Sequence, residues 1–403
     1  MTQTPDVFAP ATLGPVRLRN RVVKAATFEG ATPDALVTDD LVEYHLRVAR
    51  GGVGMTTVAY LAVSPEGRTD RHQIYLRHEA LPGLRRLTDA IHAEGAAVAG
   101  QLGHAGPVAN GRSNRARALS SYRMPSPLSM QMIATATDAD IARVTRDYVQ
   151  GARLAVRAGF DSLEMHLGHN YLLSSFLSPN LNRRKDRWGG SLENRARFPR
   201  QVVRAVREAV GDQVAVTAKM NMSDGVRSGF RIEESLDFAS MLESDGALDA
   251  IQLTCGSSLT NPMYLFRGGV PLKEFADTMP PLQRWGIKAV GSKFFRHYPF
   301  EEAYMLPMAR RFRERLDLPL MLLGGINKRE TMELAMAEGF EYVAMARALL
   351  REPDLVNRMS EGRADEGLCI HCNRCMPTIY SRTRCPVIEE YMHVVQTGCP
   401  ASD

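Results

Sequence analysis

The stretch DADIARVTRDYVQGARLAVRAGFDSLEMHL, residues 138 to 167, decides the fold of this 403-residue chain. Its first two thirds carry apolar residues at helical spacing, and it ends in a short apolar run, SLEMHL, that is typical of a buried strand. Strands that alternate with helices pair in parallel, because each crossover returns the chain to the same end of the sheet. The stretch therefore predicts one helix–strand unit of a parallel α/β fold.

The same unit recurs along the whole chain. The other seven runs are VVKAAT (22–27), VGMTTVAYLAV (53–63), AAVAGQL (96–102), VAVTAKM (214–220), DAIQLT (249–254), LPLMLLGG (318–325) and YVAMA (342–346). Helical patterns cover residues 38–50, 81–94, 138–158, 192–210, 233–244, 299–315 and 328–338, and a short helix is expected before Pro353. Eight alternating units predict a TIM (β/α)8 barrel, with a doubly wound sheet as the competing fold.

The composition argues against several classes of partner. Lys and Arg number 50 against 45 Asp and Glu, and no basic run suggests binding to nucleic acid or to a membrane surface. The first 20 residues lack the apolar stretch of a signal peptide, and no run of apolar residues is long enough to span a membrane. We expect a cytoplasmic homo-oligomer that acts on a small molecule.

A barrel places its chemistry at the C-terminal ends of the strands and in the loops that follow them. The residues at these ends are Gln101, His166, Lys219, Gly324 with Gly325, and Ala346 with Arg347. A long stretch, residues 256–298, follows the sixth run and contains Gly, Pro and aromatic residues. Long loops of this kind often cover an active site.

His166 and His169 are three positions apart just past a strand end, so their imidazoles can direct N–H groups at one oxygen. A carbonyl held in this way accepts electrons more readily, because negative charge grows on its oxygen as hydride arrives at the β-carbon. Tyr171 can then supply a proton. The alternative is that two loop histidines are merely satisfied polar groups. Lys219 is a buried cation that needs an anion beside it.

Residues 164–198, EMHLGHNYLLSSFLSPNLNRRKDRWGGSLENRARF, closely resemble the signature of the old yellow enzyme family of flavin-dependent ene reductases. The segments NRVV (20–23), QLGHAG (101–106), GGI (324–326) and EPDL (352–355) follow in the order of that family. The resemblance implies a TIM barrel that holds FMN at the C-terminal ends of its strands. It also implies an enzyme that takes hydride from NAD(P)H and reduces the activated C=C bond of an α,β-unsaturated carbonyl compound.

The resemblance also implies a role for each strand-end residue. Gln101 would bind the pyrimidine edge of the flavin, and Lys219 would stabilise the reduced ring. The catalytic residues would be His166, His169 and Tyr171, and the phosphate would lie against Gly324, Gly325, Ala346 and Arg347. The chain departs from the family at Ala26 and Thr27 beside the flavin, at Tyr60, where a small residue is common, and at Ala346, where Gly is usual. Tyr60 could narrow the pocket or add a second phenol near the ring.

Four cysteines are concentrated in CIHCNRCMPTIYSRTRC (369–385): Cys369, Cys372, Cys375 and Cys385. Such spacing lets three thiolates surround one face of a cluster while a returning loop brings the fourth. It resembles the [4Fe–4S] site of the 2,4-dienoyl-CoA reductase and trimethylamine dehydrogenase branch, although the last spacer is shorter and the FAD and pyridine-nucleotide domains of that branch do not follow. Zinc, or four thiols without metal, are the alternatives.

These observations divide the chain into an FMN-binding barrel, residues 1–356, and a cysteine-rich extension, residues 357–403. Two other functions stay open. One is a flavin dehydrogenase or demethylase that passes electrons through a [4Fe–4S] cluster to a partner protein. The other is a flavin-binding module without turnover, against which the intact His166, His169 and Tyr171 argue. Cys255 and Cys399 show no ligand spacing and are expected to be a buried thiol and a tail thiol.

Overall fold

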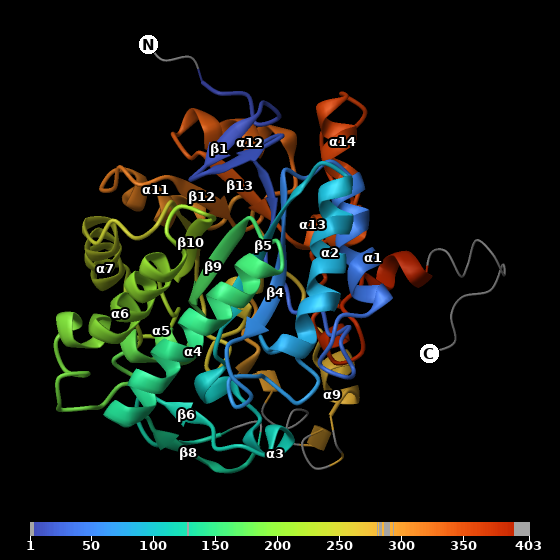
Figure 1. Cartoon of the computed structure of the whole chain (residues 1–403). Coiled ribbons are helices and arrows are strands. Elements are labelled where there is room, and N and C mark those ends of the chain that lie inside the picture. The colour runs from blue at the N-terminus through green and yellow to red at the C-terminus, as the bar shows by residue number, and fades with distance from the viewer. Residues whose placement is uncertain are drawn as a thin grey trace.

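The computed structural model describes residues 4–126, 129–279, 281, 284–285, 291–292 and 294–390. Eight parallel strands close into one barrel in chain order, and the last strand pairs with the first (Figure 1). The strands are β3 (Val22–Lys24), β4 (Met55–Ala62), β5 (Ala97–Gly103), β9 (Ser162–Leu167), β10 (Ala215–Asn221), β11 (Ala250–Thr254), β12 (Leu320–Leu323) and β13 (Tyr342–Met345). Each lies within or overlaps one of the eight predicted runs. The TIM barrel is confirmed, and the doubly wound sheet is wrong.

Helices surround the barrel, and all except the last one, which follows Pro353, lie in the intervals that the sequence indicated. They are α1 (Asp39–Arg50), α2 (Leu81–Ala93), α4 (Asp138–Arg157), α6 (Leu192–Val210), α7 (Ile232–Ser244), α11 (Leu306–Arg313), α12 (Arg329–Ala337), α13 (Arg347–Arg351) and α14 (Leu355–Ser360). Among the described residues, no helix is both long and apolar enough to cross a membrane.

The prediction of a helix over residues 299–315 was wrong at its start. Helix α11 begins at Leu306, and Pro307 lies in its first turn, where a missing N–H costs nothing. The residues before it form turns instead. Tyr304 and Met305 are buried there against the glycines that follow β12, and this contact explains why the helix does not begin earlier.

Helix α4 shows why the helical segments form where they do. Thr137 and Asp140 make a capping box, in which each side chain accepts a hydrogen bond from the other residue's backbone N–H. Its buried side chains, among them Ile141, Val144 and Tyr148, recur at three- and four-residue intervals. This face packs on the barrel, and the capping box fixes where the helix begins.

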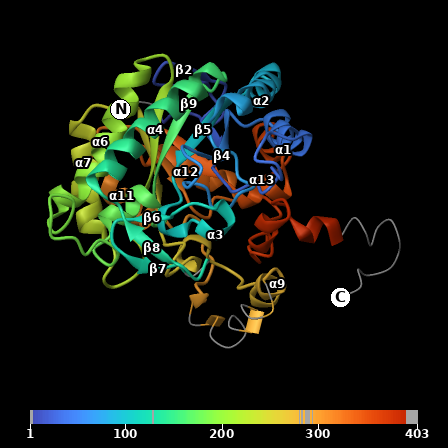
Figure 2. The same cartoon turned by 60° about the horizontal axis from the view of Figure 1, so that its bottom comes forward.

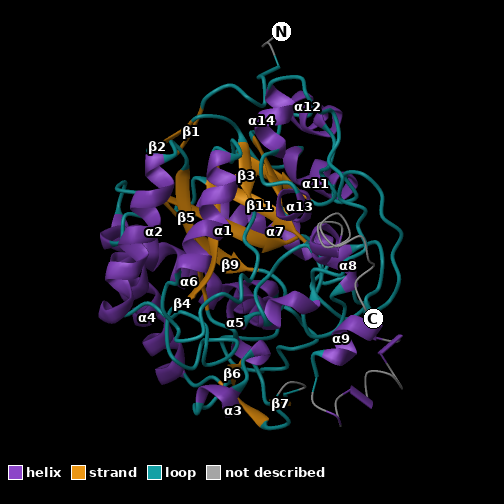
Figure 3. Ribbon diagram, turned by 90° about the vertical axis from the view of Figure 1, so that its right-hand side faces the viewer, coloured by secondary structure: helices purple, strands orange, loops and turns teal. Residues whose placement is uncertain are grey.

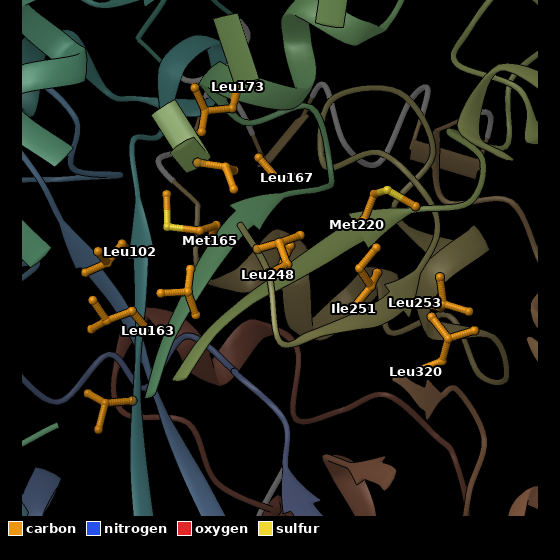
Figure 4. Close-up of a cluster of buried hydrophobic side chains, with 14 of the residues drawn as sticks. Leu102, Leu163, Met165, Leu167, Leu173, Met220, Leu248, Ile251, Leu253 and Leu320 are labelled. Carbon is orange, nitrogen blue, oxygen red and sulfur yellow. The ribbon is translucent and has the colours of Figure 1, made fainter. Parts of the chain in front are cut away.

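Side chains on the barrel strands alternate between two layers. Leu163, Met165 and Leu167 of β9 point outward into the large core between strands and helices (Figure 4). The inner layer combines small apolar residues with Met55, Met321 and Tyr342, and it is closed at the N-terminal end by the hairpin β1 (Ala11–Leu13) and β2 (Val16–Leu18). One end of the barrel interior is therefore filled with apolar side chains.

The opposite end of the barrel carries the additions to the fold, and Figure 2 turns it forward. They comprise β6 (Leu119–Ser120), β7 (Met124–Pro125), β8 (Met132–Thr135), α3 (Gly111–Asn114), α5 (Leu172–Leu177), α8 (Met263–Phe266), α9 (Leu272–Asp277) and the 3₁₀ turns η1 (His78–Ala80), η2 (Gly106–Val108) and η3 (Pro377–Tyr380). Figure 3 shows β6, β7 and α9 at the end of the molecule away from β1 and β2.

Candidate active site

A buried carboxylate organises the polar residues inside the barrel. The side chain of Gln101 donates from Nε2 to Oε1 of Glu164 at 2.6 Å, and Nζ of Lys219 lies 3.5 Å from the same oxygen. Gln252 donates to the other oxygen of Glu164. All four side chains are buried. Burial lowers the pKa of Lys219, and Glu164 opposes this effect.

Lys219 therefore has an anion beside it within the chain. The strand register places Lys219 opposite His166, and Glu164 lies two positions before His166 on the same face of β9. Sequence reasoning predicted an anion for Lys219 but did not identify Glu164. Side chains two positions apart on a strand share one face, so the sequence SLEMHL could have indicated that Glu164 lies beside His166.

The three predicted catalytic residues lie together at the end of β9. The ring centroids of His166 and His169 are 5.3 Å apart, and those of His166 and Tyr171 are 4.4 Å apart. His169 and Asn170 both have left-handed backbone angles, with φ of 58° and 62°. The N–H of His169 donates to Oδ1 of Asn221 at 3.1 Å, so the end of β10 holds this unusual turn.

Both histidines are neutral near pH 7. Burial holds the pKa of His166 well below its usual range, and the nearby His169 and Lys219 add to the effect. Burial, followed by the charge of Lys219, lowers the pKa of His169 to about 3. His169 Nε2 lies 3.0 Å from the Thr254 hydroxyl, whereas the buried Nδ1 of His166 has no hydrogen-bond partner among the described residues. His166 therefore has a ring nitrogen available for a ligand.

Two phenols lie beside the histidines. The rings of Tyr60 and Tyr171 meet edge to face with centroids 5.5 Å apart. The Tyr60 hydroxyl donates to the carbonyl of Gly67 at 3.0 Å and lies 3.0 Å from the hydroxyl of Thr69. Burial raises the pKa of Tyr171 to about 12, so it remains a protonated phenol. Tyr60 therefore lies in the site, but its hydroxyl already forms hydrogen bonds with Gly67 and Thr69.

Ala26 and Thr27 follow β3 and lie on the same side of the barrel. Ala26 packs against the apolar cluster that contains Tyr60. The Thr27 hydroxyl accepts a hydrogen bond from Lys24 Nζ at 2.8 Å and lies 3.0 Å from the Tyr44 hydroxyl. The buried Lys24 ammonium therefore anchors the segment after β3 through Thr27.

That cation belongs to a buried cluster that sequence reasoning missed. Lys24 Nζ lies 3.8 Å from Oε1 of Glu29, and His45 Nε2 lies 3.3 Å from the same oxygen. Glu29 also accepts the backbone N–H of Ala59 at 2.9 Å, next to Tyr60. Burial lowers the pKa of Lys24 to about 8, although Glu29 opposes it. A lysine inside the apolar run VVKAAT was the available signal.

Gly324 and Gly325 form a tight turn after β12, with φ of 107° and 76°. A Cβ on Gly324 would lie 2.4 Å from Cγ of Met305, and one on Gly325 would lie 2.6 Å from the ring of Tyr304. Both the backbone conformation and the close packing therefore require glycine. The turn lies at the end of β12, as predicted.

Ala346 and Arg347 lie at the start of α13, after the neighbouring strand β13. Arg347 donates from Nη1 to the carbonyl of Arg267 at 3.1 Å and to Oδ1 of Asn373. The long loop that begins at residue 256 after β11, called the lid loop below, and the cysteine-rich extension therefore both reach this end of the site. Sequence reasoning did not predict that contact.

The four clustered cysteines are free and half-buried. Burial raises the pKa of Cys369 and raises that of Cys375 to about 12, and the other thiols of the group contribute in the same direction. Arg347 acts in the opposite direction on both. The segment that carries the thiols lies at the barrel end that carries Arg347, whose guanidinium donates a hydrogen bond to Asn373.

The thiols do not converge as the ligands of a single ion. Within the described part of the chain, no three Cys, His, Asp or Glu side chains are placed to hold a metal ion. His371 Nδ1 lies 3.8 Å from the Cys369 sulfur. Cys255 is buried, as expected, and Cys399 lies outside the described residues.

Comparison with known proteins identifies the family. Residues 6–254 match the model of the NADH:flavin oxidoreductase / NADH oxidase family. The chain is 59% identical over 384 residues to the 4,4'-dithiodibutanoate disulfide reductase of Rhodococcus erythropolis, covering 95% of each chain. It is 30% identical over 377 residues to the metal reductase of Desulforamulus reducens, covering 93% of this chain and 52% of that one. The chain belongs to the NADH:flavin oxidoreductase family.

Solved structures agree. A 2-naphthoyl-CoA reductase in complex with 2-naphthoyl-CoA superposes with a TM-score of 0.80 at 25% identity, covering 95% of this chain and 56% of that one. The old yellow enzyme homologue from Zymomonas mobilis superposes with a TM-score of 0.73 at 20% identity, covering 95% and 98%, which supports the fold alone. The chain spans about half the length of the Desulforamulus relative. It is an enzyme of the old yellow enzyme type, whose family uses FMN and NAD(P)H.

Proposed function

We propose that this enzyme passes two electrons from NAD(P)H, through FMN, to a small electrophilic acceptor held by His166, His169 and Tyr171. The observation that carries the proposal is the pair of buried neutral imidazoles beside a protonated phenol. When bound, FMN supplies the hydride chemistry. The residues of the chain bind the acceptor, polarise it and hold the proton.

The residues at the strand ends fit FMN. The buried Nδ1 of His166, which has no hydrogen-bond partner among the described residues, is a feature that a bound ligand would explain. We propose that Gln101 and Lys219 face the flavin ring. The other proposed contacts are Ala26, Thr27 and Tyr60 near the ring, and Gly324, Gly325, Ala346 and Arg347 at the phosphate.

The first acceptor class is an α,β-unsaturated carbonyl compound. A neutral imidazole carries one N–H, so His166 and His169 can each donate one hydrogen bond to the carbonyl oxygen. Such donors stabilise the negative charge that develops there during hydride transfer to the β-carbon. Tyr171 keeps its proton near pH 7 and can deliver it to the α-carbon.

The second acceptor class is a small organic disulfide. It is favoured by a different observation, the 59% identity to a disulfide reductase over 95% of both chains. Two electrons break the S–S bond and release two thiolates, which take up two protons. Tyr171 can supply one of these protons, and His166 and His169 can donate hydrogen bonds to a departing thiolate.

One experiment compares the two acceptors. The purified enzyme is reduced with NADH or NADPH without oxygen and then mixed with 2-cyclohexenone or with 4,4'-dithiodibutanoate while flavin absorbance is followed. Rapid return of the oxidised flavin spectrum with one compound assigns the acceptor class. The proposal would be contradicted if neither compound reoxidises the reduced flavin, or if the protein releases FAD instead of FMN.

We further propose that Cys369, Cys372, Cys375 and Cys385 bind a [4Fe–4S] cluster, which would allow electrons to pass to a partner protein. The sequence spacing of the four cysteines supports this assignment, and a tetrahedral zinc ion is the alternative. Iron, sulfide and zinc are measured in anaerobically prepared protein. If the protein contains neither iron nor zinc, and these four cysteines react as free thiols, both the cluster assignment and the zinc assignment are contradicted.

We also propose that residues 1–356 are the FMN-binding barrel and residues 357–403 the extension, and that the enzyme is a cytoplasmic homo-oligomer. The support for the division is that α14 (Leu355–Ser360) is the last helix to pack on the barrel before the cysteines. Light scattering after gel filtration measures the mass of the assembly, and a monomer would contradict the last point.

A further inference from the structure

The cysteine-rich extension reaches the barrel through Asn373, which lies between the second and third clustered cysteines. This residue is only 1% exposed, whereas Cys372 and Arg374 on either side of it are half-buried. Its backbone has a left-handed conformation with φ of 60°, as does that of His371 with φ of 55°. The extension therefore turns sharply at this point and points one amide into the protein.

The side-chain amide of Asn373 forms hydrogen bonds with Arg347 and with the loop after β11. Oδ1 of Asn373 accepts a hydrogen bond from Nη1 of Arg347. Its Nδ2 donates to the carbonyls of Arg267 and Gly269, both at 2.9 Å. Arg347 Nη1 also donates to the Arg267 carbonyl, at 3.1 Å. One amide thus joins the start of α13, the lid loop and the extension.

The contact fixes Arg347 without using all its donors. A guanidinium carries five N–H groups, and the two hydrogen bonds of Nη1 leave three N–H groups on Nη2 and Nε. The Tyr304 hydroxyl also contacts this guanidinium. A planar group held at one corner presents its remaining edge in a defined direction, which suits a phosphate. The orientation of that edge depends on the residue that holds the corner.

The residues around this contact are closely packed. The His371 ring stacks on Phe300 with centroids 3.4 Å apart and planes 8° apart. Gly269 donates its N–H to the His371 carbonyl at 2.9 Å, and a Cβ on Gly268 would lie 2.2 Å from that carbonyl. Only glycines allow the lid loop to approach the extension so closely.

The extension also touches the loop that follows the two glycines after β12. Asn327 donates from Nδ2 to the carbonyl of Gly367 at 2.7 Å, and Gly367 returns a bond from its N–H to the carbonyl of Asn327 at 2.8 Å. The extension therefore contacts Arg347 and also a residue two positions after Gly325.

We propose that Asn373 is a positioning residue that orients the Arg347 guanidinium toward the FMN phosphate, so that the cysteine-rich extension completes the cofactor site. The inference rests on the proposed binding of the phosphate by Arg347. It gives the extension a function in flavin retention that does not depend on which metal, if any, the cysteines hold.

The test uses the full-length chain freed of flavin and titrated with FMN or with riboflavin, which lacks the phosphate. Asn373→Ala should weaken FMN binding about tenfold or more, because a charge-assisted hydrogen bond that orients the cation is lost. Riboflavin binding should change less than about twofold, since no phosphate is involved. Asn373→Asp keeps an oxygen facing Arg347 and should bind FMN more tightly than Asn373→Ala.

Asn357→Ala is the matched control. Asn357 also donates its amide to a backbone carbonyl, that of Arg50 at 2.8 Å, but it lies at the start of α14 near the N-terminal end of β4. This variant should bind both flavins as the unmodified chain does. Equal weakening of FMN and riboflavin by Asn373→Ala, or no weakening of either, would overturn the proposal.

A double variant separates this inference from the phosphate assignment. If Asn373 acts through Arg347, then Arg347→Ala with Asn373→Ala should bind FMN no more weakly than Arg347→Ala alone. Fully additive losses would overturn the inference while leaving Arg347 at the phosphate. An Arg347→Ala variant with unchanged FMN affinity would instead refute the phosphate assignment itself.

Discussion

The two ends of the candidate site are built in different ways. At the acceptor end, His166, His169 and Tyr171 come from six consecutive residues at the end of one strand. At the phosphate end, Arg347 meets a carbonyl 80 positions earlier, that of Arg267, and a side chain 26 positions later, that of Asn373. A site made by one turn can be recognised from spacing, whereas a site made by three distant segments depends on the closed barrel.

The largest effect is expected at the acceptor end, from Tyr171→Phe. Reoxidation of the reduced enzyme by 2-cyclohexenone should slow by about 10²–10⁴-fold, because the proton donor is lost. Tyr60→Phe should cost about tenfold at most, since its hydroxyl makes only neutral hydrogen bonds to Gly67 and Thr69. Stopped-flow absorbance measures both rates. A larger loss with Tyr60→Phe would reverse the two assignments.

The region between the two ends is tested by Lys219→Met. This change leaves the buried Glu164 carboxylate without its cation and should lower the free energy of unfolding of the flavin-free chain by about 3–5 kcal/mol. Urea denaturation measures the loss. The double variant with Glu164→Gln should recover much of it. If the single variant is as stable as the unmodified chain, the ion pair does not hold the strand ends together.

A smaller effect is expected from His166→Ala or His169→Ala. Each removes one hydrogen-bond donor and should weaken phenolate ligands by about 1.5–3 kcal/mol, or about ten- to a hundredfold in affinity. Titration of the charge-transfer absorbance between phenolate and oxidised flavin measures this. FMN affinity should hold steady, because the phosphate end is built separately. Phenolate binding that is unaffected in both variants would place the histidines outside the acceptor site.

The smallest effect concerns acid stability. Above pH 6.5, His169 is neutral in both the folded and unfolded chains. Below pH 6.5, His169 becomes protonated in the unfolded chain, whereas in the folded chain it stays neutral down to about pH 3. The free energy of unfolding therefore decreases as the pH falls from about 6.5 to about 3. His169→Gln should reduce the slope of unfolding free energy against pH by up to about 1.4 kcal/mol per unit. An identical slope would mean that His169 titrates normally.

The barrel was predictable because its signal repeats. Each of the eight predicted apolar runs overlaps one observed barrel strand. The alternation of strands and helices is compatible with only a few chain topologies. The start of α11 was missed because the packing of Tyr304 and Met305 against two glycines is a tertiary contact. A helical pattern cannot reveal that such a contact competes with the helix.

The candidate site divides in the same way. The spacing of His166, His169 and Tyr171 was sufficient to place them together. The Lys24–Glu29 pair joins a strand to a loop, and the contact of Asn373 with Arg347 joins the extension to the barrel. Neither has a fixed spacing in sequence, so only the folded chain brings these partners together.

The hairpin of β1 and β2 has a kinetic consequence. It fills the N-terminal end of the barrel with apolar side chains, including Leu13 and Leu18, so the buried polar residues at the strand ends must be reached from the opposite face. NAD(P)H and the acceptor would therefore share one entrance and exclude each other. Initial rates measured against both compounds should give parallel double-reciprocal lines, and high concentrations of either should inhibit by occupying the place of the other.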